Sequence, residues 1–65
     1  GLLWPVLKSY LVKRLNSLEA EAEASARMEE TFRSVYAKRI LNEFVGSVES
    51  LIKTLKEIVR EEDGK

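Results

Sequence analysis

The residue types that usually carry enzyme chemistry are scarce in this 65-residue sequence. It contains no histidine and no cysteine, so the usual general base, the thiol nucleophile and the two commonest ligands of transition metals are missing. Its serines have no histidine to activate them, and a chain this short encloses no deep pocket that would activate a lysine. We find no glycine-rich phosphate loop and no zinc-ligand spacing. The sequence therefore predicts no catalytic residue, no cofactor and no enzyme.

Carboxylates are the one abundant group. Glu29 and Glu30 are adjacent, and Glu61, Glu62 and Asp63 form a second cluster. Hard cations such as Ca²⁺ prefer oxygen ligands, but neither cluster has the spacing or the glycine of an EF-hand loop. We interpret both clusters as solvated helix ends and predict no metal site.

The elements that carry these residues are predicted to be helical. Apolar residues recur at intervals of three and four along almost the whole chain, and the only proline is Pro5, as expected for amphipathic helices. The stretch "LEAEAEASARMEE" consists largely of strong helix formers. Pairs of opposite charge four residues apart favour a helix across residues 23–33. We therefore predict an all-α fold of one or two long amphipathic helices, as a kinked rod or a helical hairpin.

Three places compete for a turn. Gly46 followed by Ser47 fits a helix end and a new start, and Asn16 with Glu19 resembles a capping box. A turn within residues 19–31 would give two arms of comparable length. The apolar pattern keeps its phase across Gly46 and Asn16, so we expect the helix to continue through both, and helix propensity argues against a turn in 19–31.

An apolar ladder with steps of four begins at residue 28. Each step advances the apolar stripe by about 40° around an ideal helix, so residues 32–45 carry large apolar groups on almost every side. One partner helix cannot cover such a segment, and we predict that helices from other copies surround it. The residues assigned to this oligomer interface are Met28, Phe32, Tyr36, Ile40, Leu41, Phe44, Val48, Leu51, Ile52, Leu55 and Ile58.

We interpret the chain as a single small helical module with four segments. They are a basic amphipathic segment (1–18), a Glu/Ala-rich helical spacer (19–31), a main apolar packing helix (32–62) and a tail (63–65). Eleven basic and eleven acidic side chains balance overall, but the charge alternates in blocks along the chain. Such blocks either set the register between neighbouring chains or form a solvated surface of mixed charge.

These features predict a non-enzymatic structural subunit that self-assembles by helix packing into a bundle, a filament or a coat-like array. Its partners are other copies of itself, and the plainest form is a hairpin that dimerises into a four-helix bundle. No apolar run approaches the roughly 20 residues of a transmembrane helix. Neither the charge balance nor the lack of cysteine indicates a compartment.

Two alternative functions use the basic residues. The first is contact with a membrane surface or a partner helix through the N-terminal amphipathic segment, by way of Leu3, Trp4, Leu7 and Leu11. The second, less favoured, is packaging of nucleic acid, which needs basic side chains along one surface. The basic residues do not share one face of a straight helix and the net charge is zero, so nucleic acid is not the partner we expect.

Overall fold

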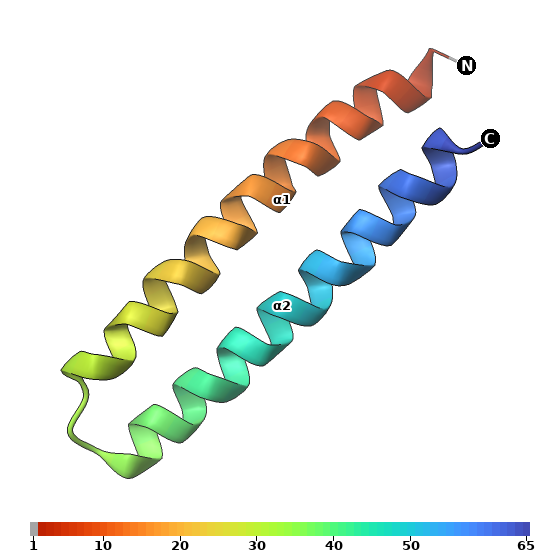
Figure 1. Ribbon diagram of the computed structural model, residues 1–65. Coiled ribbons are helices and arrows are strands. Elements are labelled where there is room, and N and C mark those ends of the chain that lie inside the picture. Colours follow the sequence, from red (N-terminus) through yellow and green to blue (C-terminus); the bar gives the residue numbers. More distant parts are fainter. Residues whose placement is uncertain (1) are drawn as a thin grey trace.

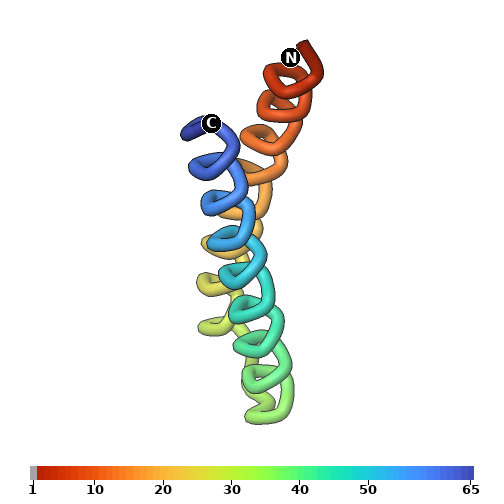
Figure 2. Tube along the Cα trace, turned by 90° about the vertical axis from the view of Figure 1, so that its right-hand side faces the viewer, coloured from red at the N-terminus to blue at the C-terminus, as the bar shows by residue number. Residues whose placement is uncertain are grey.

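The computed structural model describes residues 2–65 as two antiparallel helices joined by a short connection (Figure 1). Helix α1 spans Leu3–Met28, a single 3-10 turn, η1, spans Glu29–Thr31, and helix α2 spans Val35–Asp63. Both chain ends lie at one end of the hairpin, the open end, and the connection lies at the other, the turn end. Figure 2 shows the pair edge-on, as a layer one helix thick. The predicted all-α fold is confirmed, in the form of a hairpin.

Two hydroxyl side chains satisfy backbone groups on either side of the connection. Thr31 Oγ1 donates a hydrogen bond of 2.7 Å to the carbonyl of Met28, one of the carbonyls that the end of a helix leaves without a partner. Phe32 and Ser34 are extended, with ψ of 134° and 128°. Ser34 Oγ then accepts a hydrogen bond of 3.2 Å from the backbone N–H of Ala37. Ser34 is therefore the N-cap of α2.

The position of the turn corrects one expectation. A helix across residues 23–33 is wrong, because α1 ends at Met28 and the chain leaves helical geometry at Phe32. The turn therefore interrupts the ladder of steps of four between Met28 and Tyr36, and the ladder winds around a single helix only from Tyr36 to Ile52 of α2. The helix does continue through Asn16 and through Gly46, as the unbroken apolar phase at both positions predicts.

The two helices meet along a single line of side chains, which we call the seam. Its residues follow one another at intervals of three and four, apart from one interval of seven, as in a coiled coil. They are Trp4, Leu11, Leu15, Leu18, Ala22 and Ser25 from α1, and Leu41, Val45, Val48, Ile52, Leu55 and Val59 from α2. Only Leu18, Val48 and Ser25 are fully buried, and the other nine are half-buried.

The register of the hairpin follows from a contact at its open end. The indole of Trp4 reaches Asp63, and each step forward along α1 is matched by one step back along α2. Leu18, fourteen residues after Trp4, is therefore level with Glu49, which lies fourteen residues before Asp63 and next to Val48. The two most deeply buried apolar side chains thus lie near the middle of the hairpin, and burial decreases toward both ends.

The hairpin exposes more surface than its size requires. Residues 2–65 measure 51 × 15 × 12 Å along their principal axes, and the accessible surface is 5283 Å². A compact monomer of 7.4 kDa exposes about 4,200 Å². A two-helix layer has no second layer to cover it, and the excess of about 1,100 Å² reflects that shape.

Candidate interaction surface

The broad side of the hairpin next to the seam carries most of the large exposed apolar side chains. Six of them directly precede a seam residue, and Leu7 and Met28 precede the half-buried Lys8 and Glu29, which continue the same spacing. We call this surface the apolar face, and it consists of Leu3, Leu7, Tyr10 and Met28 on α1 and Ile40, Phe44, Leu51 and Ile58 on α2. Their exposed fractions range from 40% at Ile58 to 79% at Leu3.

Helix geometry places these residues on one side. Successive residues are about 100° apart around a right-handed helix, so the residue before a seam position points sideways out of the seam. Because α1 and α2 run in opposite directions, the preceding residues of both helices point to the same broad side. The two apolar stripes therefore form one surface across both helices.

The opposite broad side has the contrary character. The residues that follow seam positions are mostly charged, and we call this surface the charged face. It includes Glu19, Glu23, Glu49, Lys53, Lys56 and Arg60, and the last four line a shallow groove along α2. Val12 is also exposed there.

A shallow hollow deepens the apolar face at the turn end. It is lined by Phe32, Ala37, Ile40, Leu41 and Phe44, all of them apolar. The hollow exists because Phe32 lies in the extended connection and leaves the small Ala37 at the start of α2 between larger neighbours. A hollow lined only by apolar side chains is suited to apolar groups.

The structure divides the predicted oligomer interface between two surfaces. Leu41, Val48, Ile52 and Leu55 lie in the seam and contact the chain's own first helix. Met28, Ile40, Phe44, Leu51 and Ile58 lie on the apolar face. Phe32 is half-buried beside the hollow, and Tyr36 is exposed next to it. A role in contacts between copies stays a prediction for all of them.

The N-terminal residues predicted to contact a membrane or a partner divide in the same way. Leu3 and Leu7 belong to the apolar face, whereas Trp4 and Leu11 are half-buried in the seam. Neither helix within residues 2–65 has an apolar stretch long enough to cross a bilayer. The two exposed leucines are continuous with the apolar side chains of α2, which lie far away in sequence.

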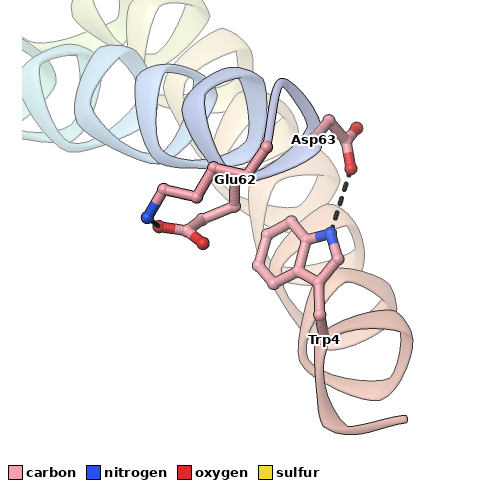
Figure 3. Close-up of polar contacts among 4 residues, drawn as sticks. Trp4, Glu62 and Asp63 are labelled. Carbon is pink, nitrogen blue, oxygen red and sulfur yellow. Dashed lines mark hydrogen bonds and ion pairs between the residues drawn. The ribbon is translucent and has the colours of Figure 1, made fainter. Parts of the chain in front are cut away.

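A polar clasp holds the open end together. Trp4 Nε1 donates a hydrogen bond of 3.0 Å to Asp63 Oδ1, and Lys8 Nζ lies 2.6 Å from Asp63 Oδ2. Figure 3 shows the indole reaching across from α1 to the end of α2. The hydrogen bonds from Lys8 and Trp4 lower the pKa of Asp63 below its ordinary value. The clasp fixes the register of the helices but is exposed to solvent, so it stabilises them only weakly.

The two carboxylate clusters lie at the turn end and at the end of α2. Within residues 2–65, no group of three or more acidic side chains is arranged to hold a metal ion. Lys65 Nζ pairs with Glu62 Oε1 at 2.9 Å (Figure 3), and this hydrogen bond raises the pKa of Lys65. Two carboxylates of the C-terminal cluster, Glu62 and Asp63, are thus each paired with a lysine.

The sequence alone did not predict that the apolar stripes of the two helices form one surface. Leu7 lies far from Ile58 in the sequence, and only a hairpin brings their surfaces together. The signal is nevertheless present, since large apolar residues precede seam positions on both predicted helices and rarely follow them.

Comparison of the chain with protein-family models gives no match, and no curated protein or solved structure matches it either.

Proposed function

We propose that this chain is a non-enzymatic structural subunit that assembles with a second helical hairpin through its apolar face. The observation that carries the proposal is the contrast between the two broad sides. Large apolar side chains gather on one and charges on the other. A helix pair with one apolar side has the pattern of half a four-helix bundle.

The exposed area supports a contact of ordinary size. The excess surface of about 1,100 Å² over a compact monomer is comparable with the roughly 800 Å² that each partner buries in a standard interface. Large contiguous exposed apolar patches on soluble proteins mark interaction sites. A second layer packed on the apolar face would supply the core that the single layer lacks.

The experiment is sedimentation velocity across a hundredfold dilution, with helix content followed by circular dichroism on the same samples. We expect discrete small oligomers that dissociate on dilution. Very large species would point instead to a filament or coat-like array. A fully helical monomer at every concentration would contradict self-assembly.

Matched glutamate substitutions locate the contact. Ile40→Glu places a charge on the apolar face, and Lys53→Glu places the same side chain on the charged face. We expect Ile40→Glu to abolish association, because a buried unpaired carboxylate is costly. Lys53→Glu is expected to leave association unchanged, and equal effects from the two would refute the assignment of the face.

A second candidate function, contact with a membrane surface, has one observation in its favour. Leu3 and Leu7 are exposed beside basic side chains at the open end, a composition found in interfacial helices. The chain has a single tryptophan, Trp4, at the same end. Anionic phospholipid vesicles are expected to shift its fluorescence to the blue if this function applies, and an unchanged spectrum would eliminate it.

A further inference from the structure

Four of the eight residues of the apolar face are placed symmetrically about its middle. On α1, Leu7 and Met28 are equally distant from a point between residues 17 and 18. On α2, Ile40 and Ile58 are each nine residues from Glu49. The register of the hairpin puts these two midpoints at the same level, because Leu18 is level with Glu49 when Trp4 is level with Asp63.

Two charged residues on the α1 stripe of this face, one basic and one acidic, lie at symmetric positions. Arg14 precedes the seam residue Leu15, and Glu21 precedes the seam residue Ala22. Both charged side chains are exposed. Their midpoint again falls between residues 17 and 18. A half-turn about that level therefore carries Arg14 of one hairpin toward the position of Glu21 in another.

The two halves of the hairpin also have net charges of opposite sign. The open half, residues 1–18 with 49–65, has seven basic and five acidic side chains, a charge of +2. The turn half, residues 19–48, has four basic and six acidic side chains, a charge of −2. Two hairpins laid face to face with their ends reversed therefore bring opposite charges together at both ends.

We propose that the partner of the apolar face is a second copy of this chain with its ends reversed, related by a twofold axis at the level of Leu18. This inference rests on the proposed function and specifies its partner and geometry. Helix α1 then packs on α1 of the second copy and α2 on its α2. A twofold contact requires a self-complementary surface, and the symmetric positions of Arg14 and Glu21 together with the opposite charges of the two halves are complementary in this sense.

The reversed arrangement brings the symmetric positions together, while Phe44 lies opposite Thr54 and Leu51 opposite Ser47. Leu7 of each copy meets Met28 of the other, and Ile40 meets Ile58. Arg14 meets Glu21, twice per dimer. The alternative twofold arrangement, with both turns at one end, lays α1 over α2 of the second copy. Arg14 then lies at the level of Lys53, between Leu51 and Thr54 of the apolar stripe on α2, and has no acidic partner there. The two +2 halves then lie together.

Disulfide cross-linking tests the orientation, because the chain has no cysteine of its own. Ser17 lies beside the proposed axis, so two copies of Ser17→Cys are expected to form a disulfide-linked dimer under mild oxidation. Ala24→Cys is the matched control on the same stripe. In the reversed dimer its two copies are about 20 Å apart along the axis, beyond the reach of a disulfide. A mixture of Ala24→Cys with Tyr10→Cys is expected to cross-link between the two variants.

The result separates this inference from the proposed function. If sedimentation shows a dimer and Ser17→Cys does not cross-link, the reversed arrangement is overturned and self-assembly stands. If no oligomer forms at any concentration, the proposed function itself fails. A dimer that cross-links through Ser17 and through the mixed pair supports both.

A charge exchange gives an independent test. Arg14→Glu and Glu21→Arg each place like charges at the two symmetric contacts, and we expect each variant alone to dimerise about tenfold more weakly. Mixed together, they restore both opposite-charge contacts and are expected to form the heterodimer preferentially. Lys53→Glu with Glu19→Lys makes the same change of net charge on the charged face, and this mixture should show no preference. An equal preference in both mixtures would overturn the Arg14–Glu21 pairing.

Discussion

The two faces that flank the seam are built on the same two helices and are equally close to the same core, yet their compositions are opposite. The apolar face carries side chains such as Phe44 and Leu51, whereas the charged face carries Lys53 and Arg60 at equivalent distances from the seam. Solubility of the hairpin alone would favour charge on both faces. This asymmetry is the basis of our proposal that the apolar face packs against a further layer of protein.

The largest expected effect comes from breaking the seam that both faces share. Leu18 is 2% exposed, and Leu18→Ala is expected to lower the free energy of unfolding by about 2–5 kcal/mol. Leu51→Ala, the same substitution on the apolar face, should cost only about 0.5 kcal/mol in dilute solution. Urea unfolding followed by circular dichroism measures both. Equal losses at low concentration would mean that the seam is not the core of the single hairpin.

Raising the protein concentration sharpens this contrast. Association stabilises the folded chain, and Leu51 then contributes to a buried contact. We expect the cost of Leu51→Ala to grow with concentration, while the cost of an equivalent substitution on the charged face stays constant. A concentration-independent effect at Leu51 would argue against the apolar face as an interface.

The turn provides the next effect in size. Ser34 Oγ accepts a hydrogen bond from the first turn of α2, and Ser34→Ala is expected to lower stability by about 1 kcal/mol. Ser34→Asp serves as the control, because aspartate retains an oxygen acceptor at the N-cap. Thermal unfolding of the three proteins measures this effect. Equal midpoint temperatures for the alanine and aspartate variants would mean that the N-cap does not stabilise α2.

A stabilising substitution is expected on the charged side. Gly46 lies within α2, and an added Cβ would meet no atom within 4 Å. Gly46→Ala is expected to raise the free energy of unfolding by about 0.8–1.0 kcal/mol, through helix propensity. Because Gly46 follows a seam position, association should not change. Weaker association of this variant in sedimentation experiments would mean that the interface extends beyond the apolar face.

The smallest effect concerns the clasp at the open end. The pKa of Asp63 is lowered in the folded chain by hydrogen bonds from Lys8 and Trp4, so this contribution is present above the ordinary pKa of aspartate. It is lost as the pH falls through the lowered value, below about pH 4. Asp63→Asn is expected to remove this part of the acid dependence, which a comparison of melting temperatures between pH 6 and pH 2 measures.

Much of the fold follows from the spacing of residues in the sequence. An unbroken apolar phase predicts that the helix passes Asn16 and Gly46, and both helices do so. The site of the turn is harder to predict, because strong helix formers precede it and neither glycine nor proline marks it. There the hydroxyls of Thr31 and Ser34 replace the usual breakers, and such local bonds compete with helix only when tertiary packing favours the turn.

The apolar face is predictable only in part. Its residues are recognisable on each helix as large side chains beside the main apolar stripe. Their union into one surface depends on the antiparallel pairing and its register, which the contact of Trp4 with Asp63 reveals. Local sequence patterns contain no information on a contact across 59 positions of the chain.

The hairpin topology also determines the order in which the molecule folds. Seam partners beside the connection are close in sequence, whereas Trp4 and Asp63 are 59 positions apart. The entropy lost in closing a loop increases with its length, and contacts between near neighbours form fastest. We expect the helices to zip from the turn end, with the capped start of α2 in the folding nucleus. Fraying then begins at the open end, where hydrogen exchange should be fastest.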